Sequence, residues 1–130
     1  MARNIVTVGK PWESAKPFAQ GVIASGRMLY TSGIVARDRE GSLTGIRDVR
    51  AQILQCFANL GDILQAAGAD WQNVVKYTIY TTDIRAAQRA APEVVPKYFV
   101  GRPASTLVEV RSLVEAEMLV ELEAIVALDG

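Results

Sequence analysis

The chain has 130 residues, half of them hydrophobic, and its 14 basic residues balance its 14 acidic ones without a run of like charge. This length and composition predict one domain, residues 1–130, with a full hydrophobic core, and the neutral charge argues against nucleic acid or an anionic membrane as a partner. The absence of histidine excludes serine–histidine and cysteine–histidine hydrolase triads, HExxH zinc sites and a histidine-based ribonuclease site, so we expect no bound metal.

The amino-terminal residues lack the apolar stretch of a signal peptide, and no apolar run is long enough to span a bilayer. The single cysteine, Cys56, cannot form a disulfide within the chain and implies no oxidising compartment. Its place in the middle of a predicted helix favours a small core residue over a reactive thiol. We therefore expect a cytoplasmic protein.

The first third of the chain predicts three short strands. Residues 5–8 form the first of them. Apolar runs follow at 18–24 and 28–35, separated by the compact turn sequence Ser25-Gly26-Arg27. We expect these two runs to pair with each other as a hairpin.

The most regular helical pattern lies between Asp48 and Gly68. The carboxylate of Asp48 suits the amino end of a helix, apolar residues then recur every three or four positions, and Gly68 suits the carboxyl end. Residues 74–82 are rich in β-branched and aromatic side chains and predict a strand. Residues 84–99 have helical composition, but their two prolines predict a broken or two-part helix.

Two strands that carry acids close the chain. Residues 103–110 read Pro-Ala-Ser-Thr-Leu-Val-Glu-Val and residues 119–128 read Leu-Val-Glu-Leu-Glu-Ala-Ile-Val-Ala-Leu. β-branched and aliphatic residues dominate both segments, which favours strands over helices. Because side chains alternate along a strand, Glu121 and Glu123 share one face of the last strand, opposite a wholly apolar face.

If these last two strands pair with their apolar faces toward a core, Ser105 and Glu109 join Glu121 and Glu123 on the opposite face. Acids mixed with aliphatic side chains are unfavourable both in bulk water and in a dry interior, which suggests a subunit contact that holds a polar pocket. The order of elements, β-β-β-α-β-α-β-β, predicts an α+β fold with a single mixed β-sheet and two helices on one face.

Several motifs, in the right order along the chain, resemble the RidA/YjgF family of small imine and enamine deaminases. The family signature reads approximately Pro-Ala-Arg-Ser-x-Val-Glu-Val, a loop, then Ile-Glu-Ile-Glu-Ala-Ile-Ala. The matching positions are Pro103, Ala104, Thr106, Val108, Glu109, Val110, Glu121, Glu123, Ala124 and Ile125. Phe18-Ala-Gln-Gly-Val and Tyr30-Thr-Ser-Gly match two further family segments. The resemblance implies a chorismate-mutase-like fold assembled as a homotrimer, with three equal clefts between subunits that take a small-molecule ligand.

The resemblance also implies the site residues. Glu121 aligns with a glutamate that lies in the cleft near the attacking water, and Phe18, Gly33, Ser105 and Leu107 align with residues around the substrate. Three of these depart from the family pattern: Ser105 replaces an arginine that grips the substrate carboxylate, Phe18 lacks an aromatic hydroxyl, and Leu107 replaces a small residue. A serine carries no charge and donates one hydrogen bond, so we expect a substrate other than 2-aminoacrylate or 2-iminopropionate.

The glutamates also have a structural interpretation. Glu121 and Glu123 lie roughly 7 Å apart on an extended strand, close enough for one to keep a proton near neutrality if they are poorly solvated. Alternatively, both form ion pairs across the subunit contact. Their candidate partners are Arg111, Arg102 and Lys76.

Three functions remain open. The first, implied by the resemblance, is a cofactor-independent hydrolase that adds water to a small imine or enamine and releases ammonia, with Glu121 positioning the water. The second is a non-catalytic trimer that binds a small ligand. Three departures from the family pattern favour it: Phe18, Ser105, and Pro92, which replaces a frequent family asparagine. The third, ribonuclease or translational inhibition, is disfavoured by the neutral charge and the lack of histidine.

Overall fold

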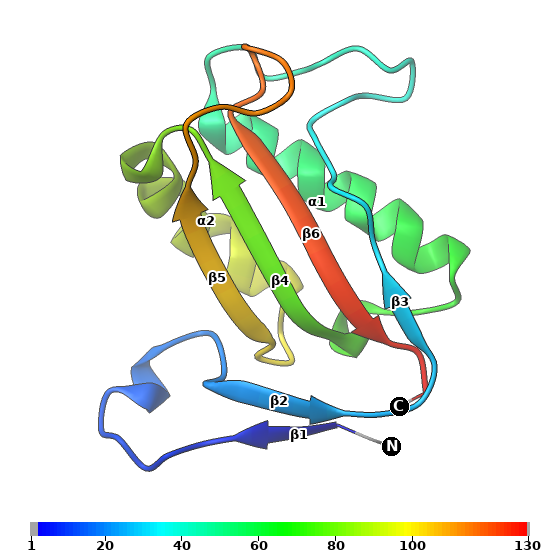
Figure 1. Cartoon of the computed structure of the whole chain (residues 1–130), viewed down its shortest axis with the longest axis vertical. Coiled ribbons are helices and arrows are strands. Elements are labelled where there is room, and N and C mark those ends of the chain that lie inside the picture. The colour runs from blue at the N-terminus through cyan, green and yellow to red at the C-terminus, as the bar shows by residue number, and fades with distance from the viewer. Residues whose placement is uncertain (1–2, 130) are drawn as a thin grey trace.

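Four strands form one mixed sheet, and two helices cover one of its faces (Figure 1). A computed structural model describes residues 3–129. In spatial order, the strands of the sheet are β3 (Met28–Tyr30), β6 (Val120–Ala127), β4 (Val74–Thr81) and β5 (Ala104–Glu109). The two helices are α1 (Val49–Ala66) and α2 (Ile84–Tyr98). β4 is parallel to β5, whereas the β4–β6 and β3–β6 pairs are antiparallel. The predicted α+β class, a mixed sheet with two helices on one face, is confirmed.

The amino-terminal strands form a second, two-stranded sheet. β1 (Arg3–Val6) pairs antiparallel with β2 (Gly21–Ala24), and the short 3-10 helix η1 (Glu13–Ala15) lies between them. In Figure 1 this pair lies below the main sheet and runs across its strands. The six strands therefore divide between two sheets.

The predicted hairpin between residues 18–24 and 28–35 is wrong, because β2 pairs with β1 while β3 pairs with β6. Hydrogen bonds at the intervening turn explain the outcome. The Arg27 backbone N–H donates to Asp129 Oδ2 at 3.0 Å, and the Arg27 carbonyl accepts from the Leu128 N–H at 2.9 Å. The turn is thus fastened to the end of β6, and β3 enters the main sheet instead of returning along β2.

The pairing expected between the last two strands is also wrong, since β4 lies between β5 and β6. The alternation along β6 itself is as predicted. One face is almost completely buried against the helical layer through Val120, Leu122, Ala124 and Val126. Glu121 and Glu123 lie on the other face, which no helix covers, and both are partly exposed.

α1 begins and ends as predicted. The Asp48 carboxylate accepts a hydrogen bond from the Ala51 N–H at 3.0 Å, and Gly68 follows the helix with φ +71°, a conformation that glycine adopts without strain. The apolar stripe of α1 packs on β6, with Ile53, Phe57 and Leu60 at most 1% exposed. A second 3-10 turn, η2 (Trp71–Asn73), leads into β4.

α2 is continuous from Ile84 to Tyr98, so the prediction of a broken helix is wrong. Each proline removes one N–H donor, but Pro92 and Pro96 lie on the exposed side of the helix, where water can satisfy the carbonyls left free. The opposite side is buried, with Ala87, Ala90, Val94 and Val95 at most 6% exposed. This burial holds the helix together across the prolines.

Gln52 fixes the position of β6 relative to α1. Its side chain is fully buried, donates to the carbonyls of Gly45 (3.2 Å) and Glu117 (2.9 Å), and accepts from the Leu119 N–H at 2.8 Å. The amide therefore ties two loops to α1, one before the helix and one before β6. The strand that carries Glu121 starts one residue beyond Leu119.

Replacing Gln52 by leucine removes all three hydrogen bonds and leaves three backbone groups without their partners, in contacts that are partly buried. We expect the Gln52→Leu variant to lose about 3 kcal/mol of unfolding free energy, measured by urea denaturation. The matched control is Gln55→Leu on the same helix, where the partly exposed amide donates only to Asn59, and it should change stability by less than about 0.5 kcal/mol. Equal losses in the two variants would contradict the anchoring role of Gln52.

Candidate functional site

The open face of the sheet carries the predicted catalytic carboxylate. Along β6 and β4 the register places Glu121 beside Tyr80 and Glu123 beside Thr78. The Tyr80 hydroxyl donates to Glu123 Oε2 at 2.7 Å, and this hydrogen bond raises the pKa of Tyr80. Within residues 3–129 the Glu121 carboxylate accepts no hydrogen bond and forms no ion pair. The two acids therefore differ: Glu123 is held by a neighbour, and Glu121 is available to a ligand.

Two of the three basic residues proposed as partners of these acids have other contacts within the chain. The Lys76 ammonium donates to Thr106 Oγ1 at 2.6 Å, and Arg102 Nη2 donates to the carbonyls of Glu13 and Phe18 at 3.1 and 3.2 Å. Arg111 forms no ion pair with a described residue. Ion pairing of the acids across a subunit contact stays a prediction.

Gly33 lies directly against the Glu121 carboxylate. The Thr31 N–H donates to the Ala124 carbonyl at 3.1 Å, and the Ile34 N–H donates to the Leu122 carbonyl at 2.7 Å, so both flanks of Gly33 are fixed to β6. A Cβ atom added at Gly33 would stand 1.8 Å from Glu121 Oε2, which leaves room for glycine alone with the carboxylate in this position. The structure therefore brings the predicted residues Glu121 and Gly33 together.

The backbone beside this carboxylate offers hydrogen-bond donors. Ser32 and Gly33 are exposed, and neither of their N–H groups has an acceptor among the described residues. Two free N–H groups beside an acid form a polar site that can hold a small molecule and take up a proton. We refer to Glu121, Ser32 and Gly33 as the acid half-site.

The other predicted residues lie on the opposite face of the sheet. β5 pairs with β4 in the register Tyr77↔Ser105 and Ile79↔Leu107, and both β4 residues point toward the helices. Ser105 and Leu107 therefore face the helical layer. Together with Phe18 they line a pocket of about 350 Å³ between β5, α2 and the loop that follows η1. We refer to Phe18, Ser105 and Leu107 as the pocket half-site.

The prediction that Ser105 and Glu109 share a face with Glu121 and Glu123 is wrong. It assumed direct pairing of the last two strands, whereas β4 lies between them and its register reverses the assignment. Glu109 instead accepts a hydrogen bond from the Ile84 N–H at 3.0 Å, at the amino end of α2.

Arg102 explains how Phe18 reaches the pocket. This residue has φ +53°, and its side chain holds the carbonyls of Glu13 and Phe18 from the start of β5. The Ala19 N–H adds a bond to the Pro103 carbonyl at 3.2 Å. The loop is thus fastened beside Ser105. Nothing in the sequence indicated this role of Arg102, because it depends on two carbonyls more than 80 positions away.

Tyr77 forms part of the pocket floor and was missed by the sequence analysis. Its ring is 5% exposed, and burial raises the pKa of its hydroxyl, an effect that a side-chain hydrogen bond with Ser105 opposes. The alternation of aromatic and β-branched residues in 74–82 indicated a strand. It did not show which tyrosine would face a ligand.

Cys56 has no place in either half-site. It is 1% exposed, and its thiol donates to the Ile34 carbonyl at 3.4 Å. Burial, with a smaller contribution from the charge of Glu121, raises the pKa of the thiol to about 12. The prediction of a core residue is confirmed, because a thiol with this pKa stays protonated and unreactive at neutral pH.

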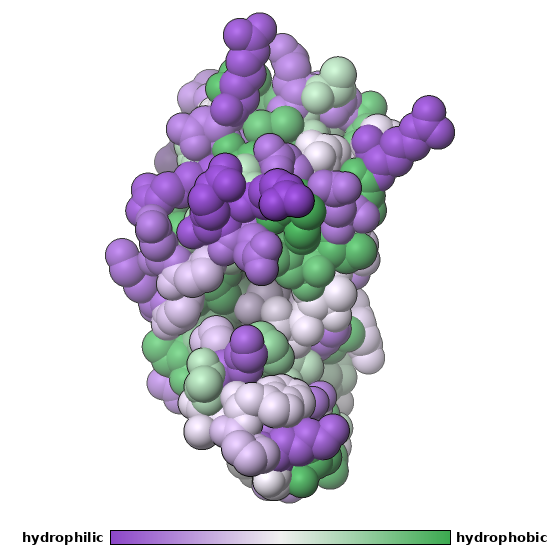
Figure 2. Space-filling view, turned by 90° about the vertical axis from the view of Figure 1, so that its left-hand side faces the viewer, coloured by the Kyte–Doolittle hydropathy of each residue, from purple (hydrophilic) through white to green (hydrophobic). Residues whose placement is uncertain are grey.

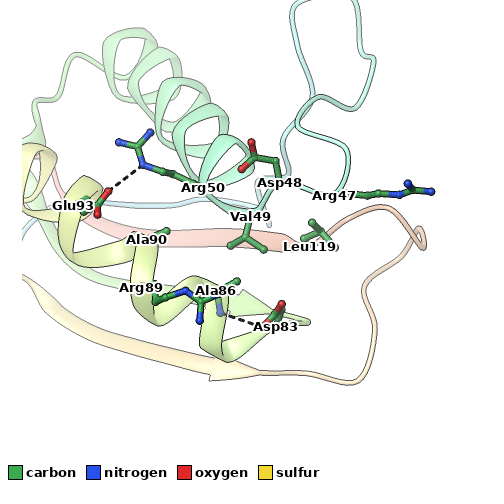
Figure 3. A pocket seen from close by; sticks show the side chains of 10 residues that line it. All are labelled: Arg47, Asp48, Val49, Arg50, Asp83, Ala86, Arg89, Ala90, Glu93 and Leu119. Carbon is green, nitrogen blue, oxygen red and sulfur yellow. Dashed lines mark hydrogen bonds and ion pairs between the residues drawn. The ribbon is translucent and has the colours of Figure 1, made fainter.

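A third opening lies between the amino ends of α1 and α2, with a volume of about 660 Å³ (Figure 3). Its acidic groups already have partners: Glu93 pairs with Arg50 at 3.3 Å, Asp48 caps α1, and Asp83 accepts from the Ala86 N–H at 3.1 Å. The Arg47 side chain points away from this opening in Figure 3. These paired charges serve the helix ends, so the opening lacks the free acid that the acid half-site offers.

Two further features bear on the chemistry. Among residues 3–129, no three histidine, cysteine, aspartate or glutamate side chains come together as metal ligands. None of the helices in this part of the chain is long and apolar enough to cross a membrane.

The comparisons with known proteins agree with the motifs. A family model described as Endoribonuclease L-PSP matches residues 9–128. The chain belongs to the RidA/YjgF family. A RutC family protein from Synechocystis is 33% identical over 116 residues, which cover 87% of this chain and 88% of that protein. The human 2-iminobutanoate/2-iminopropanoate deaminase is 30% identical over 114 residues, covering 87% and 82% of the two chains.

A solved Rid family structure, the protein YyfB of unknown function from Yersinia pestis, superposes with a TM-score of 0.89. It is 31% identical in sequence, and the match covers 98% of this RidA/YjgF family chain and 100% of the YyfB chain. The family and the fold are therefore established together. What the two half-sites bind is a separate question.

The contact between Gly33 and Glu121 gives a direct test of the acid half-site. In the Gly33→Ala variant the new methyl group should force the Glu121 carboxylate into another rotamer, visible in a crystal structure. We expect stability to change by less than about 1 kcal/mol, because the displaced atoms end a flexible side chain. Gly21→Ala is the matched control, since its added Cβ would meet only Val6, at 3.9 Å. An unmoved carboxylate in the first variant would refute the contact.

Proposed function

We propose that this protein is a cofactor-independent imine deaminase, assembled as a homotrimer whose active sites combine the acid half-site of one copy with the pocket half-site of the next. One observation carries the proposal. Glu121 and Gly33 lie on one face of the main sheet, and Phe18, Ser105 and Leu107 lie on the other. The sheet itself lies between the two sets, so one chain cannot offer both sets to one small molecule.

A second copy of the chain can bring the two half-sites to one ligand. The open face bears partly exposed acids beside exposed apolar side chains, including Tyr30 (69% exposed) and Val108 (37%), which favours cover by another chain. If the β5–α2 side of a neighbour covers that face, its Ser105 approaches Glu121. Such a contact uses two different patches on each chain, and a ring of three closes it with three equal clefts.

The residues of the acid half-site support hydrolysis of a C=N bond. The imine binds in its N-protonated form. Glu121 accepts a proton from a water molecule while the water oxygen bonds to the imine carbon and the C=N π electrons move to nitrogen, which gives a neutral carbinolamine. Glu121 then returns that proton to the amino nitrogen, the C–N bond breaks with its electron pair leaving on ammonia, and the hydroxyl proton passes through Glu121 to the ammonia, so that a carbonyl product and ammonium form. The free N–H groups of Ser32 and Gly33 can hold the oxygen during these steps. These steps require no cofactor.

The substrate differs from that of an arginine-bearing relative. The human relative is named for 2-iminobutanoate and 2-iminopropanoate, both of which carry a carboxylate. Ser105 offers one neutral hydroxyl where a guanidinium would make two charge-assisted bonds. We therefore propose a small imine or enamine other than 2-aminoacrylate or 2-iminopropionate.

Non-catalytic ligand binding is the second candidate, because the pocket half-site contains no acid or base of its own. RNA cleavage, which the name of the family model suggests, is disfavoured by a sequence with zero net charge and no histidine. We expect no nucleic acid partner.

Substitution of the free carboxylate separates catalysis from binding. With imines generated in situ by amine and amino-acid oxidases, Glu121→Gln should slow the enzyme-dependent release of ammonia about 100-fold or more while ligand binding persists. The control is Glu123→Gln, which keeps an acceptor for Tyr80 and should retain most of the rate. A wild-type protein that accelerates no imine in this panel would favour the binding function.

Mixed trimers test whether two copies share a site. Wild type should scatter light as a particle of about 42 kDa, three times the 14.1 kDa of the chain. Glu121→Gln and the pocket-blocking variant Leu107→Trp should each be inactive, and refolding them together should restore about one quarter of the clefts. Gly33→Val mixed with Glu121→Gln damages the same half-site twice and should restore none. Failure of the first mixture, with both variants folded, contradicts a shared site.

A further inference from the structure

We infer that the pocket beside Ser105 takes an uncharged, mainly apolar part of the ligand and selects against a carboxylate. The inference rests on the proposed function, because this pocket is the half of each cleft that determines which substituent the imine carries. It goes further by naming the substrate class: a neutral imine with an alkyl or aryl group in place of an imino acid.

Apolar side chains make up most of the pocket lining. Its floor combines Ile79 and Leu107 with the hydroxyls of Tyr77 and Ser105, and Phe18 closes the side toward the amino-terminal loop. Hydrophobic surface in a pocket of about 350 Å³ suits an alkyl or aryl group. Figure 2, which faces the left-hand side of Figure 1 where β5 and α2 lie, shows apolar residues interspersed among hydrophilic ones on this side of the molecule.

Within residues 3–129, the pocket floor carries no charged side chain. A carboxylate on this floor would lose its hydration and gain only neutral hydroxyl donors in return. Burial raises the pKa of Tyr77, which shows that the floor already disfavours negative charge. Among the described residues, Lys16 is the only charged one that lines the pocket, and it is exposed at the surface. A flexible exposed ammonium compensates a buried anion poorly.

One face of α2, which includes its two prolines, lines the pocket. Gln88, Pro92 and Pro96 are spaced by four residues, share this face of the helix, and all line the pocket. The proline rings present apolar surface, and the Gln88 amide offers uncharged hydrogen-bonding groups, which suit an N–H or carbonyl group of a neutral ligand and offer no positive charge to an acid.

Phenylacetamide and phenylacetate test the inference, since they have the same shape and differ in charge. By isothermal titration calorimetry on the assembled wild-type protein, the amide should bind about tenfold or more tightly than the acid. Ser105→Arg, checked for folding by circular dichroism, should reverse the preference. Arg89→Ala, on α2 but in the separate opening between the helix ends, is the control and should leave the preference unchanged.

A second variant keeps the test independent of the arginine substitution. Ala91→Phe fills the pocket from α2 and should weaken phenylacetamide binding about tenfold or more. Equal or tighter binding of phenylacetate to wild type overturns the inference, and so does the absence of binding of both ligands at millimolar concentration. The measured quantity is binding affinity. If the protein selects the amide but hydrolyses no imine, the proposed function is wrong and this inference still holds.

Discussion

Side chains on a strand point alternately to the two faces of a sheet, and the register of β4 decides which face each functional residue takes. β4 lies between β5 and β6 and pairs with both. Ser105 of β5 lies beside Tyr77 and therefore on the same side of the sheet as the buried face of β6, whereas Tyr80 lies beside Glu121 on the open face. A shift of one residue in either pairing would exchange these faces. The division into two half-sites follows from this register, and the proposed function needs a second copy for that reason.

Polar contacts far apart in the chain hold each half-site in place. Gln52 fixes the loop that leads into β6, and Arg102 fixes the amino-terminal loop that carries Phe18. Both side chains bond mainly to backbone carbonyls and therefore position whole segments. Glu121 lies on β6, and Ser105 and Leu107 lie on β5, so rigid strands hold these side chains in fixed positions.

The departures from the family pattern converge on one physical change. Ser105 removes a guanidinium, Leu107 adds apolar surface, and Pro92 replaces an amide side chain by a ring, and all three line the same pocket. Their combined effect is a neutral, more hydrophobic pocket half-site. The acid half-site keeps its glutamate, its glycine and its free backbone donors. In the proposed function, the chain keeps the groups that would handle water and a proton and differs from the family pattern in those that would select the substrate.

Local patterns were sufficient for much of the fold. Asp48 and Gly68 marked the ends of α1, and alternation identified the buried face of β6, because caps and side-chain periodicity depend on neighbours a few residues away. The site residues Glu121, Gly33, Ser105, Leu107 and Phe18 came from motif resemblance. Tertiary structure alone decided that β2 pairs with β1, that β4 separates β5 from β6, and that α2 continues through Pro92. Strand pairing and helix continuity depend on burial against elements distant in the chain, which no local pattern encodes.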